Sequence, residues 1–172
     1  TYTININRQA ASVNNAGGNN NQNNNNQNNT DVNITSGKYS IGTYITGIEP
    51  GTGAADFVKN IAVSASGTVK LLTSSGSENS GKIATGNKVA VYDASGNLKK
   101  TYDIVIYGDI NGDGAVNALD MIKLNRHILG KGTLTGAYLE AADANRKRDG
   151  GNALDMIIMN RHILGKSKIS QN

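Results

Sequence analysis

The chain contains no cysteine, no tryptophan, one phenylalanine and one proline. Without cysteine it has no disulfide bond, no thiolate metal site and no cysteine nucleophile. Its two histidines have neither cysteines nor a pair of glutamates beside them, which leaves little material for a zinc site or for acid–base catalysis. No apolar run reaches the roughly 18 residues that a membrane-spanning helix requires, so we expect no membrane insertion. We predict that the protein is not an enzyme.

The net charge of +4 is too small and too dispersed to predict a nucleic-acid partner. Lysine and arginine are scattered along the chain, and their one run of three is residues 146–148. Nucleic-acid-binding domains usually concentrate basic residues on one face. Hydrophobic residues make up 37% of the chain and glycine is frequent, which favours small modules with many turns.

The first 35 residues divide into two parts. Residues 1–7, TYTININ, alternate like a strand and resemble TYDIVIY at 101–107. We therefore predict that residues 1–13 are the remnant of an upstream domain, and the absence of an initiator methionine indicates a fragment or a mature form. Residues 14–35 are rich in asparagine and glutamine, which bury no apolar surface and predict a flexible linker.

Residues 36–107 have the pattern of a compact β-rich module. The stretches KYSIGTYITGI, TVKLLTSS and KVAVYDASGNLKKTYDIVIY are typical of strands, and the turn residues 93–97 predict a hairpin. Residues 54–61 predict one short helix. No paired carboxylates and no nucleophile–base set stand out, so the module is either structural or a ligand-binding surface.

Residues 109–120, DINGDGAVNALD, fit the twelve-residue calcium loop closely. Calcium prefers six to eight oxygen ligands, which such a loop supplies from positions 1, 3, 5, 7, 9 and 12. Gly114 stands at position 6, where the loop turns sharply, and an aspartate replaces the usual glutamate at position 12. The predicted ligands are Asp109, Asn111, Asp113, the carbonyl of Ala115, Asn117 and Asp120.

A strand pattern precedes this loop where an EF-hand has a helix, and a helical pattern follows it. The sequence therefore predicts half of an EF-hand. A second copy follows about 35 residues later, so the half-motif is used twice.

The second loop, residues 143–155, has thirteen residues and is irregular. We align Asp149–Gly150 with positions 5 and 6 of the first loop, displaced by an insertion. The basic residues 146–148 oppose a cation, so we expect a second calcium ion in distorted geometry, with a metal-free loop as the alternative. The predicted ligands are Asp143, Asn145, Asp149, Asn152 and Asp155.

The helices after the two loops are nearly identical. NALDMIKLNRHILGK (117–131) and NALDMIIMNRHILGK (152–166) share thirteen of fifteen positions. Packing alone does not require this, because buried positions tolerate exchanges among Leu, Ile and Met. Either the duplication is recent, or both helices present the same face to the same partner.

Paired half-EF-hands of this form resemble dockerins, the modules that bind cohesins in cellulosomes and related assemblies. The resemblance rests on GDINGDGAVNALD and DGGNALD and covers residue 108 to about 166. YITGIEPGT and the strand that runs into the first loop resemble the X-modules that precede some dockerins. The resemblance implies an α+β chain, with a sandwich-like, β-rich X-module (36–107) before a small all-α dockerin (108–172) that has two calcium loop–helix repeats.

The resemblance also implies which residues contact the partner. An Ala-Leu pair follows each loop asparagine where many dockerins have hydroxyl residues, so we expect a more apolar contact than usual. The two histidines are expected at the rim or as charges at the helix C-termini. The implied contact residues are Ala118, Leu119, Asn125 and Arg126, with Ala153, Leu154, Asn160 and Arg161 as the mirrored set. For the two leucines, a place in the core is the alternative.

The expected function is calcium-dependent binding of a cohesin, with two calcium ions. This would anchor an upstream protein in a multi-enzyme scaffold or on the cell surface, for polysaccharide degradation, in a secreted protein that is monomeric on its own. Two alternatives remain. A calcium sensor is suggested by three methionines, and glycan binding or a purely structural role is an alternative for residues 36–107.

Overall fold

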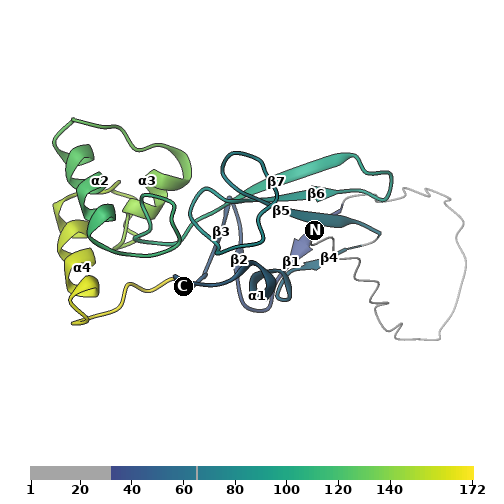
Figure 1. The fold of residues 1–172 in the computed structure, drawn as a ribbon, viewed down its shortest axis with the longest axis horizontal. Helices are drawn as coiled ribbons and strands as arrows, with labels where there is room; N and C mark the ends of the chain where they lie inside the picture. The colour runs from purple at the N-terminus through teal and green to yellow at the C-terminus, as the bar shows by residue number, and fades with distance from the viewer. Residues whose placement is uncertain (1–31, 65) are drawn as a thin grey trace, which may run out of the picture.

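The computed structural model describes residues 32–64 and 66–172, which form a β-rich part and a helical part at opposite ends of an elongated molecule (Figure 1). The predicted domain remnant at 1–13 and most of the predicted linker lie outside the described residues.

The β-rich part contains a five-stranded sheet and a separate two-stranded sheet. Neighbours in the larger sheet are antiparallel except for β3 and β7, which are parallel. The smaller sheet pairs β1 (Ile34–Thr35) with β4 (Ala62–Val63). The strand order of the larger sheet is β2 (Ser40–Ile41), β3 (Tyr44–Thr46), β7 (Leu98–Ile104), β6 (Lys88–Tyr92) and β5 (Thr68–Leu72).

The predicted hairpin is present between β6 and β7. Asp93 closes its turn, because one carboxylate oxygen accepts hydrogen bonds from the backbone N–H groups of Ser95 and Asn97, both at 2.9 Å. Gly96 takes a φ of 79°, which a side chain would disfavour. The local sequence alone therefore specifies this connection.

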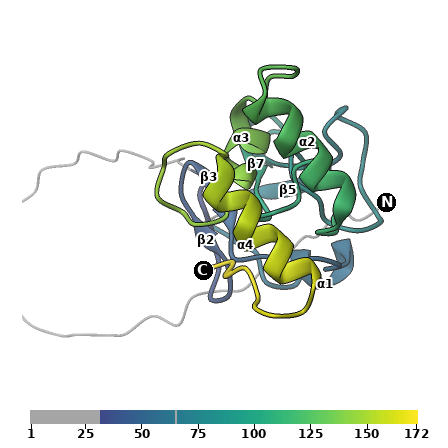
Figure 2. The same cartoon turned by 90° about the vertical axis from the view of Figure 1, so that its left-hand side faces the viewer.

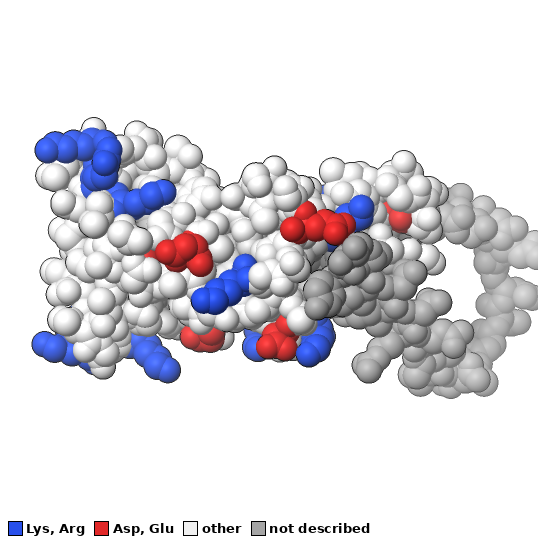
Figure 3. Space-filling view, viewed as in Figure 1, with Lys and Arg blue, Asp and Glu red and all other residues white. Residues whose placement is uncertain are grey.

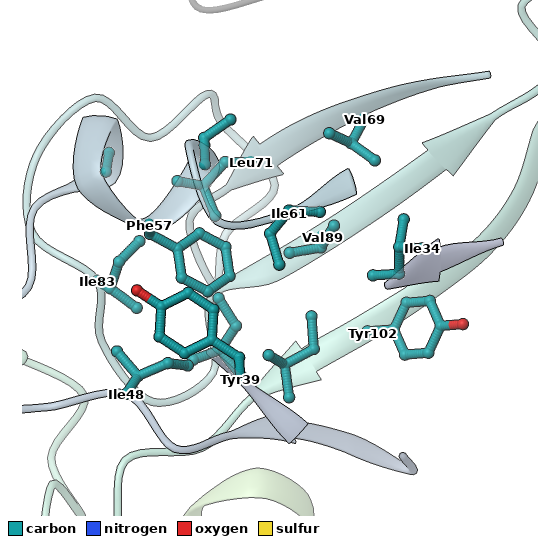
Figure 4. Close-up of a cluster of buried hydrophobic side chains, with 14 of the residues drawn as sticks. Ile34, Tyr39, Ile48, Phe57, Ile61, Val69, Leu71, Ile83, Val89 and Tyr102 are labelled. Atoms are coloured by element: carbon teal, nitrogen blue, oxygen red, sulfur yellow. The ribbon is translucent and has the colours of Figure 1, made fainter. Parts of the chain in front are cut away.

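The core of the β-rich part lies between the larger sheet and α1 (Ala54–Val58), the predicted short helix (Figure 4). Phe57 projects from α1, is 1% exposed, and stacks on Tyr39 with ring centroids 5.0 Å apart. Alternating residues of β5, Val69 and Leu71, point into the same core while Lys70 is exposed.

The β-rich part begins earlier than the predicted boundary at residue 36. Val32 and Ile34 are buried in its core, and β1 pairs with β4. The end of the predicted linker is therefore part of the folded domain, because β1 pairs with a strand about thirty residues further on.

The helical part contains α2 (Ala118–Ile128), α3 (Gly136–Ala142) and α4 (Ala153–Ile163). Helices α2 and α4 pack side by side at the end of the molecule (Figure 2). The core between the helices includes Leu124 and Met159, which are both 0% exposed.

The half-EF-hand description is correct for the first loop and wrong for the second. The first loop follows β7 and a short buried stretch, residues 105–107. The second loop is preceded by α3, a seven-residue helix that ends at Ala142. Its small residues, Ala137 and Ala141, are buried and let α3 approach the helical core closely.

The chain end returns to the junction between the two parts. The Gln171 side chain accepts a hydrogen bond from the Tyr107 backbone N–H (2.8 Å) and donates one to the Tyr107 carbonyl (3.0 Å). Ile169 is buried in the helical core. No helix in the described part of the chain is long and apolar enough to span a membrane.

Candidate calcium loops and the repeated helix face

The first loop is organised around the Asp109 carboxylate, which is fully buried. Its Oδ1 accepts hydrogen bonds from the N–H groups of Gly112 (2.9 Å) and Asp113 (3.0 Å). Its Oδ2 accepts from Gly114 (3.1 Å) and from Thr85 of the β-rich part (2.8 Å). The first residue of the loop therefore holds three backbone N–H groups of the loop, at residues 112–114.

Asp120 closes the loop from the other end. Its Oδ1 accepts from the N–H groups of Ile110 and Asn111, both at 2.8 Å, and its Oδ2 accepts from Asn117 (2.9 Å). The Asn117 side chain in turn accepts from the Leu119 N–H (2.8 Å), which completes a capping box at the start of α2. Asp120 thus both closes the loop and caps the start of α2.

The first loop contains two buried carboxylates, Asp109 and Asp120, that form no ion pair with a basic side chain in the described residues. Burial raises the pKa of Asp109 to about 6, with the Thr85 N–H opposing the rise and the Asp120 carboxylate adding to it. Burial also raises the pKa of Asp120. A bound divalent cation would neutralise this charge, so the residues present fit calcium.

The second loop repeats the hydrogen bonds of the first. The Asp143 carboxylate accepts from the N–H groups of Lys147 (3.1 Å) and Arg148 (2.6 Å). Asp155 accepts from Asn145 (2.9 Å) and Asn152 (3.0 Å) and forms the capping box of α4. These bonds match those of Asp109 and Asp120 in the first loop.

The predicted alignment of the second loop is wrong. The Lys147 N–H donates hydrogen bonds to the side chains of Asp143 and Asn145. In the first loop the N–H of Asp113, at position 5, donates to Asp109 and Asn111 in the same way. Lys147 therefore stands at position 5. The first half of the loop therefore has no insertion, and the extra residue lies between Asp149 and Asn152. The sequence misled because an acid followed by glycine looks like positions 5 and 6.

The structure nevertheless brings Asp149 to the other acids of its loop. Oxygens of Asp143, Asp149 and Asp155 lie within 4.8 Å of one another, the one such group of three acids among the described residues. Asp149 occupies position 7, where the first loop offers the carbonyl of Ala115. A carboxylate at position 7 thus compensates in part for Lys147 at position 5.

Two arginines occupy glycine positions in the second loop. Arg146 and Arg148 have φ values of 56° and 59°, where Gly112 and Gly114 of the first loop have 78°. Side chains rarely adopt this left-handed region, and doing so costs about 1–2 kcal/mol.

Replacing Arg148, an exposed residue, with glycine should therefore stabilise the protein by about 0.5–1 kcal/mol. Lys147→Gly is the matched control, because it removes the same charge from an exposed position without a positive φ. Urea unfolding of both variants in calcium-free buffer measures the difference. A gain for Lys147→Gly as large as that for Arg148→Gly would show that charge, not backbone strain, is the cause.

The two loops should bind calcium with unequal affinity. Lys147 removes one oxygen ligand from the second loop and adds positive charge, and ligand charge sets calcium affinity. We expect calorimetry to resolve two classes of site that differ by roughly tenfold or more. Asp120→Ala should remove the stronger and Asp155→Ala the weaker, and two indistinguishable sites would contradict this ranking.

The metal-free protein should lose stability as the pH rises from about 4 to about 6. The folded-state pKa of Asp109 is raised from 3.8 to about 6, so in this window the folded state binds more protons than the unfolded state. This contribution to stability is complete below the ordinary pKa and is lost as the pH passes the raised one. The unfolding temperatures of the metal-free protein and of Asp109→Asn, which has no carboxyl group at this position, should diverge across this pH window. Parallel curves of unfolding temperature against pH would rule out this contribution from Asp109.

Comparison with known families supplies the decisive observation. Residues 107–164 match the family described as the dockerin type I domain. The match spans both loops and all three helices of the helical part. No curated protein and no solved structure matches the chain. Dockerin domains in general bind calcium and cohesins and take part in cellulosome-type assembly.

The predicted contact residues are exposed in both repeats of the dockerin segment. Leu119 is 58% exposed and Leu154 is 52% exposed, so neither belongs to the core. The remaining six are exposed as well: Ala118, Asn125 and Arg126 on α2, and Ala153, Asn160 and Arg161 on α4.

Sequence reasoning missed four further residues of these faces. On α2, Ile122 and Leu129 are 56% and 57% exposed, and on α4, Ile157 and Leu164 are 56% and 58% exposed. With the leucine and the arginine already named, each pair forms one exposed row along its helix, with successive spacings of three, four and three residues. The row on α2 is Leu119, Ile122, Arg126 and Leu129, and the row on α4 is Leu154, Ile157, Arg161 and Leu164. The signal was present, because this spacing marks one helix face, but apolar residues at helical spacing usually indicate a core.

The two positions that differ between the repeats have different environments. Leu124 and Met159 are equivalent core residues that face each other's helix. Lys123 is exposed, whereas Ile158 is half-buried against the helical core. The exposed rows themselves are therefore identical in the two helices.

The two histidines each accept a hydrogen bond from the chain that follows their helix. The Nδ1 atom of His127 accepts a hydrogen bond from the Leu134 N–H (3.3 Å), and that of His162 accepts from the Ile169 N–H (3.1 Å). Each ring thus fixes the segment that follows its helix, seven residues further on. Both histidines lie in the last turn of their helices, as expected, and this anchoring role adds to that position.

Proposed function

We propose that residues 108–172 are a calcium-dependent cohesin-binding module. The observation that carries this proposal is the pair of identical exposed rows, each of which starts directly at the acid that closes a candidate calcium loop. Helices α2 and α4, which carry the rows, lie at the end of the molecule away from the β-rich part (Figure 1), and the side chains of both rows are exposed, so a partner can approach either one. The dockerin match over residues 107–164 supports the same partner.

Two calcium ions would be held by the predicted ligands of the two loops. A bound ion supplies positive charge that keeps the acids of each loop together. Because Asp120 and Asp155 also cap α2 and α4, fixing them fixes where each helix starts. Calcium would thereby preorganise the binding faces, which lowers the cost of ordering on association.

The contact combines an apolar row with one arginine on each helix. Aromatic residues and arginine usually dominate such interfaces, and here the apolar part is aliphatic. A groove of about 540 Å³ beside α2, lined by Leu119, Ile122, Arg126 and Leu134 among others, could receive a side chain of the cohesin.

The β-rich part, residues 32–107, would serve as an X-module with a structural role. Its aromatic residues give little support to glycan binding, because four of the six rings are at most 7% exposed and the other two are half-buried. The four are Tyr39, Phe57, Tyr102 and Tyr107, and the two are Tyr44 and Tyr92. Stacking on sugars requires exposed rings. On the face shown in Figure 3 the basic side chains are dispersed among uncharged surface, which gives no support to a nucleic-acid partner.

The whole chain would act as a non-enzymatic adaptor, monomeric on its own. In a secreted protein it would attach an upstream domain to a scaffold or to the cell surface, with polysaccharide degradation as the expected setting. A calcium sensor is less well supported, since Met159 is fully buried and Met121 and Met156 are half-buried against the helical core.

A pull-down with a panel of immobilised cohesins tests this function. We expect retention by at least one cohesin in calcium and release in EGTA. The control is the chain with Asp120→Ala and Asp155→Ala together, which should not be retained in either buffer. No retention by any cohesin type in calcium would contradict the proposal.

A further inference from the structure

The β-rich part touches the first calcium loop directly. The Thr85 N–H donates to Oδ2 of Asp109 at 2.8 Å, and the Gly51 N–H donates to the carbonyl of Gly114 at 2.9 Å. Thr85 and Asp109 are 1% and 0% exposed, so water does not compete for this bond. Twenty-four residues separate them in the sequence.

The fit between the two surfaces is close. A Cβ atom on Gly112 would lie 2.9 Å from the Thr85 carbonyl oxygen, and one on Gly114 would lie 2.5 Å from the Ile83 carbonyl oxygen. The Thr85 hydroxyl also bonds both the N–H and the carbonyl of Ile106, just before the loop. The loop backbone at Gly112 and Gly114 therefore lies directly against the backbone of residues 83–85.

In the described structure no hydrogen bond joins the acids of the second loop to the β-rich part, which this loop contacts through Arg146, 5.8 Å from the centre of the Tyr107 ring. Its acids Asp143 and Asp155 accept hydrogen bonds only from backbone groups of residues 145–152. The two loops thus differ in one respect that their sequences do not show. One acid of the first loop is held from outside the dockerin segment.

We propose that Thr85 of the β-rich part is a positioning residue of the first calcium loop, so that calcium binding there and the stability of the β-rich part are linked. Thr85 N–H fixes the orientation of Asp109 before the ion arrives. Linkage is reciprocal, so calcium in the first loop must stabilise the segment that holds Asp109. The acids of the second loop accept no equivalent hydrogen bond from residues 83–87. This inference rests on the proposed calcium binding.

Amide hydrogen exchange of the full chain tests the linkage. In Asp155→Ala, which keeps the first loop, calcium should slow exchange of the Thr85 amide and its neighbours at 83–87 by about tenfold or more, a coupling of about 1.4 kcal/mol. In Asp120→Ala, which keeps the second loop, calcium should leave these amides unchanged. Equal responses in the two variants, or no response in Asp155→Ala while calorimetry shows calcium bound, would overturn the linkage alone. No calcium binding by the unmodified chain would overturn the proposed function as well.

A second pair of variants tests Thr85 itself. Thr85→Pro removes the N–H, whereas Thr85→Ala keeps it and removes only the hydroxyl bonds to Ile106. We expect Thr85→Pro to weaken calcium binding at the stronger site about tenfold relative to Thr85→Ala, with the weaker site unchanged in both. Equal affinities in the two variants would show that the bond to Asp109 does not position the loop.

Discussion

Damaging both helix faces should abolish cohesin binding, whereas damaging either one should hardly weaken it. If the molecule binds in two orientations, loss of one of two equal orientations costs only RT ln 2, about 0.4 kcal/mol. Leu119→Asp with Arg126→Ala should therefore weaken binding only about twofold, and Leu154→Asp with Arg161→Ala should do the same. All four changes together should reduce affinity by a hundredfold or more, as removal of interface hot spots does.

The structure makes this experiment clean. All four side chains are exposed, so the substitutions should not disturb folding. Binding of each variant to the immobilised matching cohesin measures its affinity. Thermal unfolding of each variant shows whether it is folded. If one double variant destroys binding while its mirror is silent, the chain uses a single orientation. The difference that would favour one face is at Lys123, because the second repeat has Ile158 at the equivalent position.

Removing calcium should lower the unfolding temperature of the dockerin segment by about 10 °C or more. An ion present at a hundredfold excess over its Kd contributes about 2.7 kcal/mol. In a domain of this size each kcal/mol corresponds to about 4–8 °C. Asp109 and Asp120 are fully buried, so without the ion their charges are only partly compensated by backbone N–H groups.

Scanning calorimetry of the full chain in calcium and in EGTA measures this shift. The variant with Asp120→Ala and Asp155→Ala should unfold at a similar temperature in both buffers. If the unmodified chain unfolds at the same temperature with and without calcium, the loops hold the fold without metal and the calcium assignment is wrong.

Much of the local structure was predictable because short-range patterns decide it. The hairpin at 93–97 depends on Asp93 and Gly96 within the turn itself. The first loop and the start of α2 follow from acids and glycines at fixed spacing. The residues that give these patterns are close together in the sequence, so the patterns can be found without knowledge of the fold.

The features that sequence reasoning missed depend on contacts far along the chain. Ile34 is a strand residue only because Val63 pairs with it. The role of Thr85 exists only because the fold places it on Asp109. The second loop was misaligned for a different reason, since Arg146 and Arg148 adopt a backbone conformation that side chains usually avoid.

The two helix faces show both sides of this lesson. The near-identity of the repeats pointed to a shared partner surface, and the predicted residues are exposed. Ile122 and Ile157 escaped notice because apolar residues at helical spacing read as core. Only the packing of α2 against α4 shows which side of each helix is left uncovered.

Titration of the chain with its matching cohesin in calcium and in EGTA tests the central claim most directly. Because α2 and α4 lie side by side at one end of the molecule, a cohesin bound to one row should block the other (Figure 2). We predict one cohesin per chain in calcium and no binding heat in EGTA. Binding of equal strength in both buffers would contradict a calcium-dependent cohesin-binding module.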